Sequence, residues 1–296
     1  MALIGVGRLG GSLGLALTRA GATLSGFLSA TDEGGRQAQA VLAMDPSPDL
    51  TTLVHTRPTH YVLAVPDAVL PAVADELASL LASAGENGPA QPFVLHTSGA
   101  TSVDVLAGCA AKGALTLAFH PLQTFSDPVR GSRRFAGAAI AVTPSAVVDE
   151  SRCLDEGFAL AEGLGACPFH LPDDKKTLYH AAATMASNYL VTLEHCAQTL
   201  FVKSGMLQQE APSLSFPLVQ TALDNVRSQG PATALTGPLS RGDESTISSH
   251  LQALAADAPD LLPLYRLMGS HTLDLVRARG EVDPQLIARM ARLLAH

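Results

Sequence analysis

The first 171 residues alternate between short apolar runs and longer amphipathic segments. Near-continuous apolar runs of this length are typical of strands that are buried on both faces of a sheet. The runs are Ala2–Val6, Thr23–Leu28, Thr51–His55, Tyr61–Val65, Phe93–His96, Ala114–Phe119, Ala138–Val142 and Cys167–Leu171. Because helical segments separate several of them, the pattern predicts an α/β fold with a mostly parallel, doubly wound sheet.

The pattern changes after Pro172. Apolar residues then recur at helical spacing, and no strand-like run follows. The predicted helices cover residues 175–203, 217–229, 244–256, 261–279 and 284–295. We therefore expect two domains, an α/β domain over residues 1–171 and an all-helical domain over residues 172–296.

A glycine-rich turn follows the first predicted strand. Gly5, Gly7 and Gly10 form the pattern G-x-G-x-x-G, and a helical stretch comes next. In Rossmann dinucleotide-binding domains these glycines make the tight turn, admit the pyrophosphate to the backbone, and let helix and strand pack closely. The N–H groups at the helix N-terminus then attract phosphate. We predict a Rossmann domain in which this turn, with Arg8 and Leu9, binds a dinucleotide.

The end of the second predicted strand bears on which dinucleotide is bound. Domains that prefer NAD usually carry an Asp or Glu about 20 residues after the glycines, where it binds the ribose 2′-hydroxyl. Ser29 stands there instead, so a 2′-phosphate is not repelled and the hydroxyl can bind it. No Arg occupies this turn, Arg36 is the nearest cation, and Ser29–Gly35 also fits a plain polar loop. On this local chemistry we expect NADP rather than NAD.

Three further strand ends carry candidate site residues, and ligands of open α/β sheets bind at the carboxyl ends of strands. Val65, Pro66 and Asp67 are expected to face the cofactor, although a strand-ending proline and a helix-capping aspartate fit equally well. Ser98 offers a donor and an acceptor beside the cofactor, or caps a helix. His120 is a candidate general acid for a carbonyl that accepts hydride, or a structural histidine.

The first long predicted helix carries a polar stripe. Lys176, His180, Thr184 and Asn188 are spaced by four residues among alanines, so they share one side of a helix. Such a stripe faces solvent, a polar partner or a ligand.

A second candidate lies in the turn-rich segment 235–243. Arg241 can clamp a carboxylate or phosphate, or it can pair with Asp243 or Glu244. Asp243 can cap the helix that follows.

Composition excludes several classes of function. The formal net charge is −8 and no basic patch is present, so we expect no nucleic-acid partner. The longest apolar stretches end well short of the about 20 residues that span a membrane. The four cysteines have neither C-x-x-C nor zinc-site spacing, so no metal is expected. With no signal-peptide pattern at the start, they favour the reducing cytoplasm.

Taken together, these segments resemble a bacterial family that joins a Rossmann-like NADP-binding domain to a helical C-terminal domain of unknown function. The resemblance rests on the glycine turn, Val65-Pro66-Asp67, His96-Thr97-Ser98-Gly99, His120-Pro121-Leu122-Gln123-Thr124-Phe125, Tyr179-His180-Ala181-Ala182-Ala183, Ser187-Asn188-Tyr189, and Thr236-Gly237-Pro238 followed by Arg241-Gly242-Asp243. The wider superfamily includes 6-phosphogluconate dehydrogenase, β-hydroxyacid dehydrogenases, ketopantoate reductase, pyrroline-5-carboxylate reductase and prephenate dehydrogenase. Membership implies a cofactor in the Rossmann cleft, a small-molecule substrate between the domains, and a homodimer formed through the helices.

The resemblance also implies residue roles. Ser98 and His120 look like the serine and catalytic histidine of prephenate dehydrogenases, so His120 is expected to carry the proton while Ser98 orients it. Asn188 matches the asparagine of the Lys-x-x-x-Asn pair in β-hydroxyacid dehydrogenases, but Thr184 stands where the lysine is expected. The predicted catalytic residues are His120, Ser98, His180 and Asn188, and the predicted substrate-binding residues are Asn188, Thr184, Thr236 and Arg241.

The chain is therefore expected to be an NAD(P)-dependent oxidoreductase that moves hydride to or from a small carbonyl, imine or hydroxy-acid substrate. The alternative, favoured by Thr184, is a non-catalytic dinucleotide-binding protein that senses redox state or supports assembly. A flavin or deazaflavin enzyme that uses the same turn is a third possibility.

Overall fold

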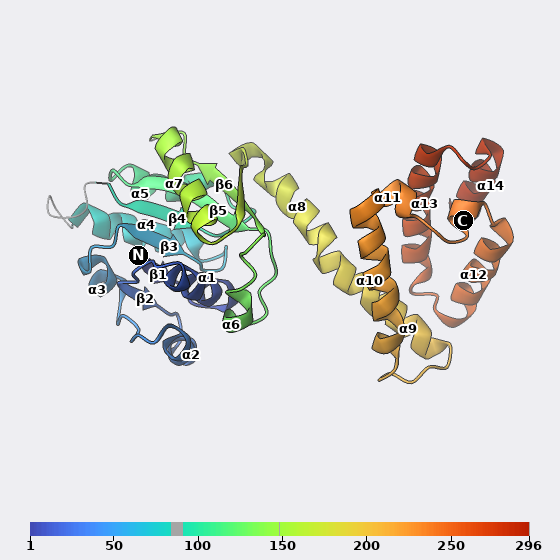
Figure 1. Ribbon diagram of the computed structural model, residues 1–296, viewed down its shortest axis with the longest axis horizontal. Helices are drawn as coiled ribbons and strands as arrows, with labels where there is room; N and C mark the ends of the chain where they lie inside the picture. The colour runs from blue at the N-terminus through green and yellow to red at the C-terminus, as the bar shows by residue number, and fades with distance from the viewer. Residues whose placement is uncertain (84–90, 148, 296) are drawn as a thin grey trace. The chain divides into compact units, whose positions relative to one another are not determined.

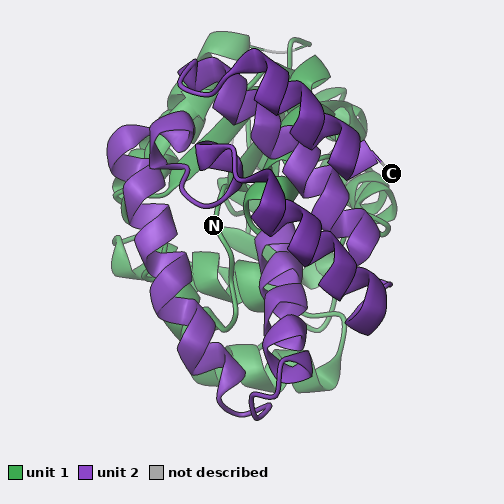
Figure 2. Cartoon of the chain, turned by 90° about the vertical axis from the view of Figure 1, so that its right-hand side faces the viewer, with its two compact units in different colours: residues 1–187 green, residues 188–296 purple. Residues whose placement is uncertain are grey.

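The computed structural model describes residues 1–83, 91–147 and 149–295 (Figure 1). The chain divides into two compact units, residues 1–187 and residues 188–296 (Figure 2). The first unit holds the sheet and the second is helical, which confirms the predicted order of an α/β domain followed by helices.

Seven strands of the first unit form one mostly parallel sheet in the order β2-β1-β3-β4-β5-β6-β7. The strands are β1 (Ala2–Ile4), β2 (Gly26–Leu28), β3 (His60–Leu63), β4 (Phe93–His96), β5 (Leu115–Pro121), β6 (Ala139–Pro144) and β7 (Cys167–His170). Only the pair β5–β6 is antiparallel among these described strands. The sheet is the Rossmann type that the sequence predicted.

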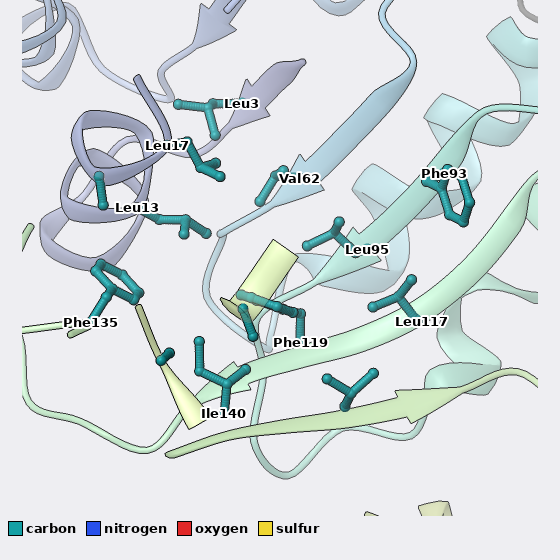
Figure 3. Packing of buried hydrophobic residues seen from close by; sticks show 14 of the residues in the cluster. Leu3, Leu13, Leu17, Val62, Phe93, Leu95, Leu117, Phe119, Phe135 and Ile140 are labelled. Carbon is teal, nitrogen blue, oxygen red and sulfur yellow. The ribbon is translucent and has the colours of Figure 1, made fainter. Parts of the chain in front are cut away.

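Helices cover both faces of the sheet. One face carries α1 (Arg8–Arg19), α2 (Asp32–Leu42) and α7 (Glu150–Gly163), and α6 (Pro128–Gly131) packs on α1. The other carries α3 (Leu50–His55), α4 (Leu70–Ser83), the 3-10 turn η2 (Val103–Leu106) and α5 (Ala107–Ala110). Successive strand residues point to opposite faces, so Leu3 joins the first core while Ala2 and Ile4 join the second. Figure 3 shows Leu13 and Leu17 of α1 over the strand residues of the first core.

The strand predicted over Thr51–His55 is wrong, because this segment is helix α3. Asp49 caps the helix by accepting a hydrogen bond from the Thr52 N–H at 2.6 Å. Leu50, Leu53 and Val54 are buried at helical spacing. The capping aspartate and this spacing outweigh the strand preference of a run rich in threonine and valine.

The register of the parallel strands places the predicted site segments at one edge. Ile4 pairs with Leu63, Leu63 with His96, and His96 with Ala118. The segments that follow β1, β3 and β4 therefore leave the sheet side by side, next to the end of β5, where His120 lies. This is the carboxyl edge, where ligands of such sheets bind.

The helix predicted over residues 175–203 is two helices. The 3-10 turn η3 (Asp173–Lys175) leads into α8 (Lys176–Ala186), and α9 (Asn188–Lys203) begins after Ser187, whose φ of −121° and ψ of −65° interrupt the helix. The units divide after Ser187 and not after residue 171, because α8 contacts the strand ends through Lys176 and Tyr179.

All regular secondary structure described in the second unit is helical. After α9 come α10 (Ala211–Gln229), α11 (Pro231–Ala234), the 3-10 turn η4 (Leu239–Arg241), α12 (Glu244–Asp257), α13 (Leu262–Arg279) and α14 (Pro284–Ala295). Its core is formed by Leu239, Ile247, Leu251, Leu273, Val276, Ile287, Met290 and Leu294. None of the helices described in the chain is long and apolar enough to cross a membrane.

Candidate functional site

The three glycines of the first turn differ in what surrounds them. Gly5 has a φ of +92°, and a Cβ there would lie 2.5 Å from the Ala64 carbonyl oxygen. A Cβ on Gly10 would lie 2.0 Å from the Gly5 carbonyl oxygen. A Cβ on Gly7 would meet no heavy atom within 4 Å. Packing and turn geometry therefore require glycine at Gly5 and Gly10, whereas Gly7 borders open space.

The N-terminus of α1 is free to bind an anion. Gly7 is the N-cap residue and offers no side-chain cap, and the first turn carries no acidic residue. Gly7 and Arg8 are exposed and Leu9 is half-buried. The first N–H groups of a helix need acceptors from outside the helix, and its dipole favours negative charge there. The residues present therefore fit the phosphates of a dinucleotide.

The segment after β2 is ordered by local hydrogen bonds. Ser29 is half-buried, and its hydroxyl donates to the Thr31 carbonyl at 3.0 Å. Thr31 caps α2 by accepting from the Gly34 N–H at 3.1 Å. Arg36 pairs with Glu33 at 2.8 Å. The plain polar loop considered for residues 29–35 is thus a short turn that leads into a helix at Asp32.

His120 lies in a cluster with two aromatic neighbours from α8. Its Nδ1 is 2.9 Å from the Tyr179 hydroxyl, and its ring centroid is 6.0 Å from that of His180. Gly99 fits between the two imidazoles, since a Cβ there would lie 2.7 Å from His120 Nε2 and 2.7 Å from His180 Cδ2. The end of β5, the turn after β4 and helix α8 therefore meet at one point.

The Ser98 hydroxyl does not orient His120, contrary to our expectation. It donates to Thr101 Oγ1 at 2.9 Å and accepts from the N–H groups of Thr101 at 3.0 Å and Ala100 at 3.3 Å. These bonds use the side chain to shape its own turn. Tyr179 is the residue that holds the imidazole.

The backbone of Ser98 is held by two buried side chains that we did not place in the site. His96 Nδ1 accepts from the Ser98 N–H at 3.2 Å, and Lys176 Nζ donates to the Ser98 carbonyl at 3.1 Å. His96 is 0% exposed and Lys176 is 1% exposed. Two features of the sequence could have pointed to these residues: His96 ends a predicted strand, and Lys176 is the first residue of the polar stripe. A fully buried lysine is rare, and nothing in its sequence context distinguishes it from an exposed one.

The burial of Lys176 affects the charge that this side chain carries near His120. Burial lowers the pKa of Lys176 to about 8, against the opposing effects of Asp173 and Asp67. In the described part of the chain Lys176 has no ion pair within 4.0 Å. At neutral pH most of the ammonium is therefore charged, donates to the Ser98 carbonyl, and is favoured by the negative charges of Asp173 and Asp67.

The histidines titrate below their ordinary range. Burial, then the charge of Lys176 and then His180, lower the pKa of His120 to about 4. Burial and then Lys176 lower the pKa of His96 to about 3, and burial raises the pKa of Tyr179 to about 12. At pH 7 His120 is a neutral imidazole, which accepts a proton more readily than it gives one. The imidazolium that a general acid would use is therefore scarce at pH 7, and the catalytic role of His120 stays a prediction.

Two family models match the chain. The Rossmann-like domain matches residues 1–121, and a domain of unknown function, DUF2520, matches residues 144–272. The two matches leave out the segment 122–143, and α8, which carries Lys176 and Tyr179, falls within the DUF2520 match.

Solved structures share this arrangement of domains. A provisionally named NADP oxidoreductase from Bacteroides fragilis is 25% identical and has a TM-score of 0.71, with 90% of this chain and 95% of that chain covered. A Thermotoga maritima protein is 20% identical at a TM-score of 0.70, covering 95% and 99%. A Streptococcus pyogenes 1-pyrroline-5-carboxylate reductase is 14% identical at a TM-score of 0.62, covering 98% and 97%. No curated protein sequence matches the chain.

The remaining predicted residues of the Rossmann-like unit lie near the carboxyl edge or on α8. Val65 is half-buried, and Pro66 and Asp67 are exposed in the segment after β3. His180 is exposed on α8, and the Thr184 hydroxyl donates to the His180 carbonyl at 3.1 Å. Their contacts with a cofactor or a substrate stay predictions.

Three predicted substrate contacts lie in the second unit. Asn188 is the first residue of α9 and is exposed, so it does not continue the polar stripe of α8 on one helix. Thr236 and Arg241 are exposed on either side of Leu239. Asp243 caps α12 by accepting from the Thr246 N–H at 3.1 Å, as its position in the sequence allowed. The substrate roles of the first three stay predictions.

Proposed function

We propose that this protein is an NADP-dependent oxidoreductase acting on a small carbonyl, imine or hydroxy-acid substrate. One observation carries the proposal. An open glycine turn at an uncapped helix N-terminus and a histidine held by a tyrosine stand at the same carboxyl edge of a parallel sheet. Nucleotide binding and proton transfer at adjoining positions are what such a reaction requires.

The cofactor would be held by backbone. The N–H groups of Gly7, Arg8 and Leu9 fit the pyrophosphate, and Gly5 and Gly10 give the turn its shape. Ser29, with no carboxylate in its place, supports NADP over NAD. The name of the Bacteroides fragilis relative points the same way. A bound nicotinamide cofactor supplies the hydride chemistry, which no side chain provides.

His120 would handle the proton. We assign the ring proton to Nδ1, where it is donated to the Tyr179 oxygen, and this leaves the lone pair of Nε2 free to accept a proton from a substrate hydroxyl. The reverse direction needs the imidazolium, which an anionic substrate beside it would favour. Lys176 and His96 hold the Ser98 peptide, and with it Gly99, against the imidazole.

Five residues remain proposed substrate contacts. His180 is the neighbour of His120 at the cluster, and Arg241 suits a carboxylate group of the substrate because its planar fork binds two oxygens. The others are Asn188, Thr184 and Thr236.

The test is turnover by a single variant. Carbonyl and imine substrates with NADPH, and hydroxy acids with NADP, are offered to the wild type and to His120→Ala. We expect activity toward at least one substrate and a loss of about 100-fold or more in the variant, with NADPH affinity nearly unchanged. Equal turnover by both proteins would remove His120 from the mechanism.

Thr184 favours a second candidate, a dinucleotide-binding protein without catalysis. Threonine cannot act as an acid or base at neutral pH, and this hydroxyl is bound to the His180 carbonyl of its own helix. Selective NADPH binding with no turnover across the whole substrate panel would support this candidate and reject the oxidoreductase.

We further propose that two copies associate through the helical domain. None of the 16 residues of α9 is buried in the single chain, and Val191 on it is 70% exposed. Phe216 and Leu218 on α10 are 58% and 68% exposed. Exposed apolar surface of this kind is typical of an interface. Light scattering should give twice the 30.6 kDa chain mass, and a monomer would contradict the proposal.

We place the protein in the cytoplasm. All four cysteines are free, and two of them, Cys109 and Cys153, are buried. A reducing compartment keeps such thiols unpaired.

A further inference from the structure

A depression of about 640 Å³ lies wholly within the helical unit, among α12, α13 and α14. Three of its lining residues are arginines, Arg266, Arg289 and Arg292, and the only acidic lining residue among those described is Glu244. The chain as a whole carries a formal net charge of −8, so a local excess of positive charge is unusual on it. The helices that form the depression pack on one core.

Arg266 is the most constrained of the three guanidinium groups. It stands on α13, is half-buried, and its Nε is buried with no hydrogen-bond partner among the described residues. It also makes no ion pair in that part of the chain. A buried donor without an acceptor costs free energy, so an acceptor from outside the chain, such as a bound anion, would stabilise this group.

The other two arginines leave donors free as well. Arg289 uses Nε to donate to both carboxylate oxygens of Glu244, at 3.1 and 2.9 Å, so its terminal nitrogens are not used in that pair. The side chain of Arg292, one turn further along α14 and exposed, makes no ion pair or hydrogen bond with any described residue. Glu244 therefore neutralises one of the three cations and orients it, and two positive charges remain.

The rest of the lining gives the depression two kinds of surface. Ser248 and Gln252 follow Glu244 at steps of four on α12, so their polar groups lie on the same side of that helix. Leu251 and Leu293 add apolar surface. A ligand for this surface needs at least two negatively charged oxygen groups and has room for an organic body.

We propose that this depression binds a small phosphate-bearing anion. Guanidinium groups bind phosphate through paired N–H donors, and several of them in one place favour a multiply charged group over a single carboxylate. Ser248 and Gln252 add neutral hydrogen bonds. This site is built only from residues 244–293 and does not depend on the dinucleotide site or on the proposed function.

The experiment is calorimetric titration of the full chain with inorganic pyrophosphate, and with citrate as a carboxylate probe of similar charge. The variants are Arg266→Gln and Arg292→Gln. The matched control is Arg227→Gln, since Arg227 also lies in the helical unit but is exposed on α10 and paired with Asp224. Arg292 is exposed, so its variant is informative even if Arg266→Gln fails to fold.

Pyrophosphate should bind the wild type and the Arg227→Gln variant equally, and each lining variant should bind at least about tenfold more weakly. Citrate should bind the wild type more weakly than pyrophosphate does. Because pyrophosphate can also occupy the glycine turn, the affinity lost in the lining variants is the measure of this site. Equal affinity in all four proteins, or citrate binding more tightly than pyrophosphate, would overturn the proposal.

Discussion

The Tyr179 hydroxyl lies 2.9 Å from Nδ1 of His120, joining helix α8 to the end of strand β5. We assign the ring proton to Nδ1, as the donor to the Tyr179 oxygen, and the other ring nitrogen, Nε2, faces Gly99 and His180. The chemistry proposed for His120 depends on this assignment, because a histidine has one free acceptor nitrogen only when the other carries the proton.

Replacing Tyr179 by Phe should leave the fold intact and free Nδ1 of His120. The lost hydrogen bond should lower the free energy of unfolding by about 1 kcal/mol. The ¹⁵N shifts of the His120 ring should move from a single tautomer toward a mixture. Tyr189→Phe is the control, since Tyr189 is 60% exposed and should change neither quantity. An unchanged ¹⁵N pattern in Tyr179→Phe would mean that Tyr179 does not set the tautomer.

Removing the charge of Lys176 should raise the pKa of His120 from about 4, because that charge is the second-largest cause of its lowering. NMR titration of the His120 ring in Lys176→Met would measure the shift. Lys175→Met is the matched control, because Lys175 is the exposed neighbour and pairs with Asp174. A His120 pKa that stays constant or falls in Lys176→Met would contradict the electrostatic account of this cluster.

The chain should lose stability in mild acid. In the folded protein His120 and His96 have pKa values of about 4 and about 3, and in the unfolded chain they titrate near 6.5. Between these values the unfolded state binds more protons, so the free energy of unfolding falls as the pH drops from about 6.5 to about 4. Each histidine should contribute on the order of 1–3 kcal/mol to this fall in the free energy of unfolding.

Urea unfolding at pH 7 and at pH 4.5 measures this loss. His96→Asn offers a control that does not titrate, since an amide oxygen can take the place of Nδ1 as acceptor for the Ser98 N–H. It should lose less stability between the two pH values than the wild type does. The same loss in both proteins would exclude His96 as a source of the acid sensitivity.

Much of the fold follows from local sequence patterns, whereas much of the candidate site does not. The glycine turn and the strand ends at Leu63, His96 and His120 are fixed by nearby residues, so apolar runs and glycines locate them. The prediction of a strand over residues 51–55 was wrong because β-branched residues also fit a short helix once Asp49 caps it.

Tertiary contacts explain what the sequence did not reveal. Lys176 belongs to a polar stripe that the sequence allowed to face solvent, a polar partner or a ligand, and only its contact with the Ser98 carbonyl, 78 residues away in the chain, shows that it is buried. Ser98 was expected to orient His120 because the two resemble the serine and catalytic histidine of prephenate dehydrogenases. The hydroxyl instead bonds within its own turn, as serine side chains near chain turns commonly do.

The glycines of the first turn can separate binding from folding. Gly7 has a φ of −66° and open space around its Cβ position, so Gly7→Ala should fold with an unchanged melting temperature. The added methyl group would stand where the backbone must approach the pyrophosphate, so NADPH affinity should fall at least about tenfold. Full NADPH affinity in Gly7→Ala would argue against a pyrophosphate at this turn.

Gly10→Ala is the contrasting variant. Its Cβ would lie 2.0 Å from the Gly5 carbonyl oxygen, so the helix and strand must move apart. We expect a lower melting temperature by several degrees, for a cost of roughly 1–3 kcal/mol. A melting temperature equal to that of the wild type would contradict the packing role of Gly10.

The most direct test of the central claim is titration of the purified protein with NADPH, NADH, NADP and NAD, followed by nicotinamide fluorescence for the reduced forms and by heat for all four. We predict dissociation constants on the order of micromolar for NADPH and NADP, with weaker binding of NADH and NAD. Preference for NADH and NAD would contradict the role given to Ser29. Binding of none of the four would mean that the glycine turn is only structural, and the oxidoreductase proposal would fail.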